Sequence, residues 1–120
     1  MKIYIILILC FSFIFPVFAR DIDDKGLECI YDKDSKRPNE YYWFFEEQVY
    51  KVWFDHKESI IKKSTYPAYY KITEEYVRFY RVFVLLGNLE FTDKNNNILG
   101  KCRFIDSFDA LENIIKSKLN

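Results

Sequence analysis

The stretch YYWFFEEQVYKVWF, from Tyr41 to Phe54, constrains the fold more strongly than any other part of the sequence. It holds both tryptophans of the chain, together with three tyrosines and three phenylalanines. One strand of this length would far exceed the usual ~5–6 residues, and the polar segment 46–48 interrupts it. Because aromatic and β-branched residues favour strands, we expect a hairpin of Tyr41–Phe45 and Val49–Phe54.

A three-residue loop in this hairpin would place Phe45 opposite Val49. One face would then be uncharged and belong to the core: Tyr42, Phe44, Tyr50, Val52 and Phe54. The other would carry Tyr41, Trp43, Phe45, Val49, Lys51 and Trp53. A shift of one residue would mix the two sets. We interpret Tyr41, Trp43, Lys51 and Trp53 as candidate contacts with a partner, since exposed Trp and Tyr can anchor a protein or stack on sugar rings. The alternative is that these large rings simply fill a small core.

Further strands are expected on both sides of this hairpin. Residues 27–31 alternate and are β-branched or aromatic, and residues 76–84 are expected to form one strand by the same criterion. A second hairpin is expected from residues 89–92 and 98–105, around the Asn-rich turn of residues 93–97.

The last segment is expected to be a helix over residues 107–118. Asp106 or Ser107 caps it, and its apolar residues recur at helical spacing: Phe108, Leu111, Ile114, Ile115 and Leu119. The predicted fold is therefore a single α+β domain over residues 27–120. It is a mostly antiparallel β-sheet, either a twisted sheet or a partly closed barrel, with one C-terminal α-helix packed on it.

The first 19 residues have the pattern of a secretory signal peptide. Lys2 forms a basic start, an apolar run of residues 3–15 follows, and Pro16 precedes a small-residue cleavage motif that ends at Ala19. The apolar run is shorter than the about 20 residues of a spanning helix. We therefore expect cleavage and no stable membrane span after it; a retained membrane anchor is the alternative. We expect an exported chain, periplasmic or extracellular, with a polar tail over residues 20–26.

The charge balance argues against one class of partner, and the cysteine content indicates one covalent bond. Lys2 is the only charge before Arg20, so cleavage leaves 17 basic residues of the 18, against 18 acidic ones. This balance argues against a nucleic-acid partner, which favours a net basic face. Cleavage also removes Cys10 and leaves Cys29 and Cys102. In an oxidising compartment such a pair indicates one disulfide bond, with two separate buried thiols as the alternative.

Signatures of catalysis are scarce. His56 is the only histidine and lies in a charged turn, the three glycines are scattered, and no cysteine and histidine cluster has metal-ligand spacing. Adjacent carboxylates such as Glu46 and Glu47 point to opposite faces of a strand, so they do not form a glycosidase pair. We therefore expect a non-enzyme without catalytic residues, metal or cofactor, unless folding brings together carboxylates such as Glu46, Glu75 and Glu90.

The placement of the cysteines, in segments 27–31 and 101–104 with Tyr- and Trp-rich strands between them, resembles the inhibitors of c-type lysozyme from bacterial envelopes. That resemblance implies a small exported β-barrel. The resemblance covers only the arrangement of cysteines and strands. The Ser-Gly-x-x-Tyr type loop of those inhibitors is not found, and its nearest counterpart, Lys63–Tyr66, lacks the glycine. The expected C-terminal helix is also additional. No functional residue is carried over.

The sequence thus predicts an exported, aromatic-rich, non-catalytic domain that binds a protein or another component of the cell envelope. Two alternatives stay open. One is an inhibitor of an envelope-acting enzyme such as lysozyme, and the other is a glycan-binding module.

Overall fold

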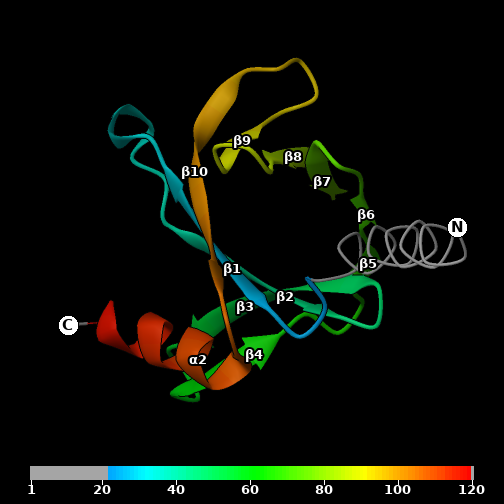
Figure 1. Ribbon diagram of the computed structural model, residues 1–120. Helices are drawn as coiled ribbons and strands as arrows, with labels where there is room; N and C mark the ends of the chain where they lie inside the picture. The colour runs from blue at the N-terminus through cyan, green and yellow to red at the C-terminus, as the bar shows by residue number, and fades with distance from the viewer. Residues whose placement is uncertain (1–21, 120) are drawn as a thin grey trace, which may run out of the picture.

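The computed structural model describes residues 22–119, which form a ten-stranded antiparallel half-barrel with one C-terminal helix in contact with it (Figure 1). The predicted α+β class is confirmed. The expected signal peptide, residues 1–19, and its cleavage position at Ala19 lie outside the described residues.

The strands follow one another around the half-barrel. Their bounds are β1 Gly26–Tyr31, β2 Glu40–Phe45, β3 Gln48–Asp55, β4 Ile60–Lys63, β5 Ala68–Tyr69, β6 Lys71–Ile72, β7 Tyr76–Phe79, β8 Val82–Leu85, β9 Glu90–Thr92 and β10 Ile98–Ile105. A short 3-10 helix, η1, spans Lys33–Ser35, and the helix α2 spans Phe108–Ser117. The order across the sheet is β4-β3-β2-β1-β10-β9-β8-β7-β6. Because β5 pairs with β3 while β6 pairs with β7, the sheet curls back on itself.

The first and last strands are neighbours in the sheet. Cys29 in β1 lies directly opposite Cys102 in β10, and the two residues form a disulfide bond with a Cα–Cα distance of 4.0 Å. This bond joins positions 73 residues apart in sequence. The expected link between the first and last strands is therefore present.

The aromatic stretch forms a hairpin, but its register differs from the expectation. Phe45 pairs with Gln48, and Phe44 pairs with Val49, so the loop has two residues instead of three. Glu46 and Glu47 both adopt positive φ values, 50° and 63°, as a tight hairpin turn of this length requires. The sequence hides this turn because Asn-Gly or Asp-Gly normally marks it. The shift by one residue puts Trp43 and Trp53 on opposite faces of the sheet.

The expected single strand over residues 76–84 is also two strands. Phe79 pairs with Val82, which leaves Tyr80 and Arg81 as a two-residue turn between β7 and β8. Tyr80 has a positive φ of 50°. The charged Arg81 interrupts the apolar alternation of this segment because it lies in the turn and not in a strand.

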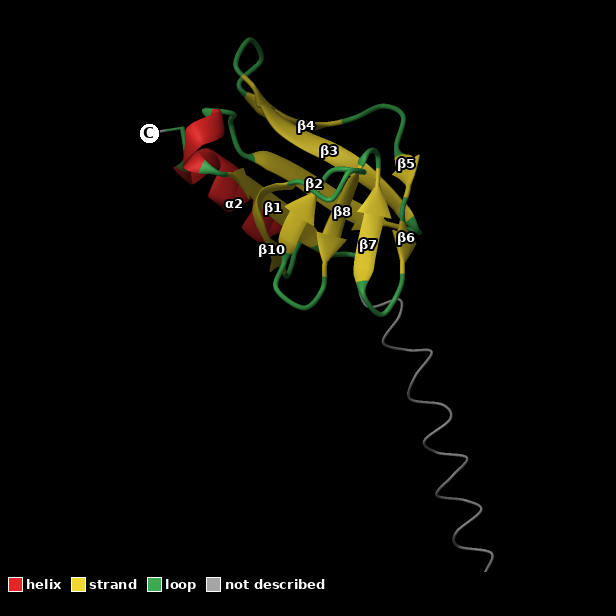
Figure 2. Cartoon of the chain, turned by 90° about the horizontal axis from the view of Figure 1, so that it is seen from above, coloured by secondary structure: helices red, strands yellow, loops and turns green. Residues whose placement is uncertain are grey.

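Two apolar cores lie on opposite sides of the strongly curved sheet. The first fills the inside of the half-barrel and includes Leu27, Phe44, Phe79 and Phe91, all nearly inaccessible to solvent. The second lies between the outer face and α2 and contains Trp43, Val52, Ile105, Leu111 and Ile115. Figure 2 shows α2 against one side of the sheet, with β7 and β8 on the other side.

The helix begins and packs as its sequence predicts. The Ser107 side chain caps it by accepting a hydrogen bond from the Ala110 backbone N–H at 3.1 Å. Leu111 and Ile115 are buried against the sheet. Gly26 lies beneath the helix, where an added Cβ would come within 3.2 Å of Leu111, so a larger residue at this position would require the Leu111 side chain to shift slightly.

The described residues before Leu27, where a polar tail was expected, contact the domain. Ile22 is buried in the inner core. The Asp24 backbone N–H donates to the Phe44 carbonyl at 2.7 Å, and the Asp23 carboxylate accepts a hydrogen bond from the Tyr70 hydroxyl. The ordered domain therefore extends at least to Ile22.

Candidate functional site

A groove lined by three tyrosines opens beside the inner core. We call it the tyrosine groove; its volume is about 700 Å³ and its lining residues are Tyr31, Arg37, Glu40, Tyr42, Lys51, Tyr80, Arg81 and Val82. These residues come from β1, β2, β3, the turn between β7 and β8, β8 itself, and the loop after η1. The curling of the sheet is what brings such distant segments together.

Positive charge predominates in the tyrosine groove. Three cations, Arg37, Lys51 and Arg81, face a single carboxylate, Glu40, which leaves a net charge of +2 among the lining side chains. The Arg37 guanidinium lies 4.2 Å from the centre of the Tyr31 ring, and the Lys51 ammonium lies 5.7 Å from that of Tyr80. Cation–π contacts of this kind hold charged groups over aromatic faces.

The carboxylate of the groove is oriented by a buried tyrosine. The Tyr42 hydroxyl donates a hydrogen bond to Glu40, and the Tyr42 ring packs edge-on against Phe79 with centroids 4.8 Å apart. Burial, followed by the hydrogen bond and the charge of Glu40, raises the pKa of Tyr42 above its ordinary value of 10.0. Burial and the Glu40 charge also raise the pKa of Tyr31. Both hydroxyls are therefore neutral donors at physiological pH.

The four residues predicted as partner contacts do not all lie on one face of the sheet. Trp43 is 9% exposed and lies under α2, where its ring meets Phe108 edge-on at 5.1 Å. Lys51 is exposed and lines the tyrosine groove. The corrected register separates these two residues because their side chains leave opposite faces of the sheet.

The other two predicted contacts come together near the C-terminal end of α2. Tyr41 and Trp53 line a second groove of about 400 Å³, the helix-end groove, whose other lining residues are Pro38, Asn39, Val52, Phe54, His56, Ile115, Lys118 and Leu119. Trp53 is 43% exposed and Leu119 is 42% exposed. Burial raises the pKa of Tyr41, so its hydroxyl also stays protonated.

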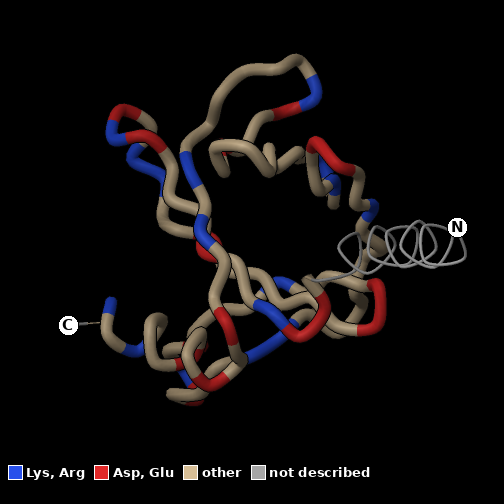
Figure 3. The backbone as a smooth tube through the Cα atoms, viewed as in Figure 1, with Lys and Arg blue, Asp and Glu red and all other residues tan. Residues whose placement is uncertain are grey.

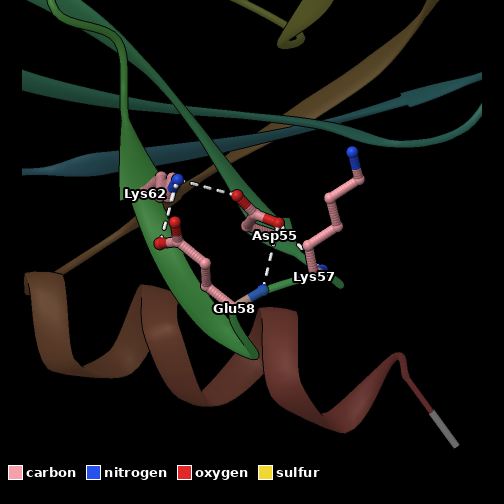
Figure 4. Close-up of polar contacts among 4 residues, drawn as sticks. All are labelled: Asp55, Lys57, Glu58 and Lys62. Carbon is pink, nitrogen blue, oxygen red and sulfur yellow. Dashed lines mark hydrogen bonds and ion pairs between the residues drawn. The ribbon is translucent and has the colours of Figure 1, made fainter.

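Next to this groove, the turn between β3 and β4 is held by a partly exposed ion-pair network (Figure 4). Lys62 contacts Asp55 at 2.8 Å and Glu58 at 3.1 Å. The hydrogen bond from Lys62 lowers the pKa of Asp55 below its ordinary value, and Asp55 raises that of Lys62. His56 is exposed in this turn and packs on Phe54 at 5.0 Å. These interactions are those of a structural turn.

A buried carboxylate, that of Glu28, forms an ion pair with the exposed side chain of Arg103, and neither residue lines the two grooves described above. Glu28 is 1% exposed, and its Oε1 accepts a hydrogen bond from Arg103 Nε at 2.6 Å across the β1–β10 pair. Its Oε2 has no hydrogen-bond partner within the described residues. We assign this pair to the stability of the domain, because neither residue lines a described groove.

Most of the tyrosine groove has no recognisable signal in the sequence. Tyr31 and Tyr42 are predicted as strand residues without a binding role, and no sequence pattern marks Arg37, Glu40 or Tyr80. The available clue was Arg81, whose charge breaks the alternation of an apolar segment at the position where a turn lies.

Within residues 22–119 no three residues of the metal-ligating types His, Cys, Asp and Glu come together. In the same part of the chain, no helix has both the length and the apolar character needed to cross a membrane. Comparison with known protein families, curated proteins and solved structures finds no match for this chain.

Proposed function

We propose that this protein is an exported, non-catalytic binding domain that holds a component of the cell envelope in the tyrosine groove. The observation that carries the proposal is the composition of that groove, where three aromatic rings lie among three cations and one oriented carboxylate. A concave site with apolar walls and a few converging polar groups is the usual form of a ligand site.

Export is supported by two features. The N-terminal sequence has the pattern of a signal peptide. The disulfide between Cys29 and Cys102 fits an oxidising compartment, where such bonds form and persist.

A non-catalytic role is supported by the arrangement of the groove. Among the described lining residues the only carboxylate is that of Glu40, which already accepts a hydrogen bond from Tyr42, and both buried tyrosines are held as neutral hydroxyls. His56 lies in the exposed turn between β3 and β4 and does not line this groove.

A direct test is calorimetric titration of the oxidised chain from Arg20 with fragments of envelope glycans. We expect Tyr80→Ala to weaken binding by about tenfold, since truncating a central contact ring commonly costs more than 1 kcal/mol. Tyr66→Ala is the matched control, because Tyr66 is 87% exposed and lines none of the described grooves. Equal binding by both variants would contradict the proposed location.

The helix-end groove is the competing location, because it unites two of the predicted contact residues, Tyr41 and Trp53. A protein partner docked there would lose affinity with Trp53→Ala and not with Tyr80→Ala. Lysozyme turnover, measured with a large molar excess of the domain, tests the inhibitor alternative separately. Inhibition lost only in Trp53→Ala would move the functional surface to the helix end.

A further inference from the structure

A third groove adjoins the tyrosine groove and is more strongly basic. We call it the basic groove; it has a volume of about 390 Å³ and lies around β6, β7 and β8. Four of its lining residues are cations: Lys71, Arg78, Arg81 and Lys94. Among the described residues that line it, none is acidic. Figure 3 shows basic positions on the β6–β8 segment and on the loop after β9.

The cations of the basic groove are not neutralised by the rest of the described fold. Lys71 and Arg78 lie directly opposite each other in the β6–β7 pair, and like charges in such positions destabilise a sheet. The ion pairs formed within residues 22–119 involve other cations, namely Lys25, Lys62 and Arg103. An anionic ligand would relieve this repulsion.

Of the nearby acidic side chains, that of Asp23 accepts a hydrogen bond from the hydroxyl of Tyr70, a lining residue, and none is itself among the described residues that line the groove. Asp93, at the start of the loop that carries Lys94, accepts hydrogen bonds from the backbones of Asn95 and Asn97. Glu74 and Glu75, in the exposed turn between β6 and β7, do not line the groove. Although the whole chain is nearly neutral, its charges are therefore distributed unevenly.

The two grooves meet at the turn between β7 and β8, because Tyr80 and Arg81 line both of them. We infer that together they form one extended site for a linear acidic glycan, a chain of sugar rings that carries carboxylate or sulfate groups. This inference rests on the proposed function and names its ligand class. Six cations line the combined site: Arg37, Lys51, Lys71, Arg78, Arg81 and Lys94.

Glu40 is the feature that favours a sugar over a simple polyanion. A chain of phosphates offers only acceptors and negative charge, which the Glu40 carboxylate repels, and an acidic peptide offers no donor except its backbone N–H groups. A sugar chain also offers hydroxyl donors, which Glu40 accepts, while its rings stack on Tyr80 and on the highly exposed Tyr69. Ring stacking, cation pairing and a hydroxyl acceptor thus occur together along one surface.

The test uses oligogalacturonates of two and eight units, titrated into the oxidised chain from Arg20 at low and moderate salt. We expect the octamer to bind more tightly than the dimer, with a difference that shrinks as salt screens the cations. Replacing Lys71 and Arg78 together by glutamine should weaken octamer binding by about tenfold, the size that a few solvent-exposed charge contacts supply. Dimer binding should weaken less, so that the advantage of the octamer over the dimer becomes smaller.

Two further variants keep the result interpretable. Lys57→Gln combined with Lys116→Gln removes the same charge from exposed positions outside the grooves, and octamer binding should not change. Lys94→Gln alters the basic groove from an exposed loop without touching a strand pair, so it should weaken octamer binding even if the paired substitution perturbs the sheet.

Each other outcome overturns a defined part of the inference. Equal affinities for dimer and octamer, unaffected by the basic-groove variants, would reject the extended site and leave the proposed function standing. Tighter binding of poly-glutamate or single-stranded DNA than of the octamer would reject a glycan as the ligand. If neutral oligosaccharides bind at the tyrosine groove and acidic oligosaccharides do not bind, an acidic glycan is rejected as the ligand and the proposed function stands. An absence of binding to all these probes and to envelope glycan fragments would reject both proposals.

Discussion

The two tryptophans of the aromatic hairpin should differ sharply in what they contribute to stability. Trp43 is 9% exposed and lies between the sheet and α2, whereas Trp53 is 43% exposed at the rim of the helix-end groove. Trp43→Ala removes a large buried side chain and should lower the free energy of unfolding by about 3–5 kcal/mol. Its edge-on contact with Phe108 accounts for about 1 kcal/mol of that loss.

Trp53→Ala is the matched control, since it makes the same chemical change on the same strand pair. Because surface substitutions usually change stability little, we expect a loss below about 1 kcal/mol. A domain of this size is stable by only about 5–15 kcal/mol, so the two variants should be easy to distinguish in urea unfolding followed by far-ultraviolet circular dichroism.

Fluorescence quenching provides an independent measurement of the same difference. Trp43→Phe leaves Trp53 as the only indole, and iodide should quench its emission strongly. Trp53→Phe leaves the buried Trp43, whose emission should be blue-shifted and weakly quenched. Equal losses of stability, or equal quenching of the two single-tryptophan variants, would show that both side chains share one face and that the two-residue turn is wrong.

Three other predictions concern charge and covalent structure. Arg103→Met should lower the free energy of unfolding by about 3 kcal/mol, because it leaves the buried Glu28 carboxylate unpaired. Adding Glu28→Gln should recover part of that loss in urea unfolding. Purely additive effects of the two substitutions would contradict a coupled pair. Replacing Cys29 and Cys102 by alanine should lower stability by about 4 kcal/mol, given the 73-residue separation, and an unchanged urea midpoint would argue against the bond. The lowered pKa of Asp55 means that its contribution to stability is present above its ordinary value of 3.8 and is lost as pH falls through the lowered folded pKa. Asp55→Asn should therefore flatten the acid limb of Tm against pH, and an unaltered limb would count against the turn network.

Local chemistry in the sequence was sufficient to predict several elements. Ser107 and the apolar spacing from Phe108 onward determine where α2 begins and which side packs, because capping and helical periodicity act within a few residues. The alternation of β1 and β10 made both of them recognisable as strands. The two cysteines that remain after the expected cleavage indicated their pairing, since only one intramolecular bond is available to two thiols.

The faces of the hairpin and the location of the candidate site depended on tertiary structure. The turn at Glu46 and Glu47 uses positive φ values without glycine or asparagine, so the surrounding fold, and not local preference, sets the register. Because side chains alternate along a strand, that single shift sent Trp43 into the outer core and left Trp53 exposed.

The sequence by itself thus determined the strand-rich composition, the capped C-terminal helix and the disulfide, all of which rest on local periodicity or on counting. Only the tertiary structure decided that Tyr31, Glu40, Lys51 and Arg81 line one groove. These residues are far apart along the chain, and their proximity comes from the curvature of the sheet and from the two tight turns that fix strand register. A nearly neutral chain acquires a basic surface in the same way, because folding places cations from separate segments side by side.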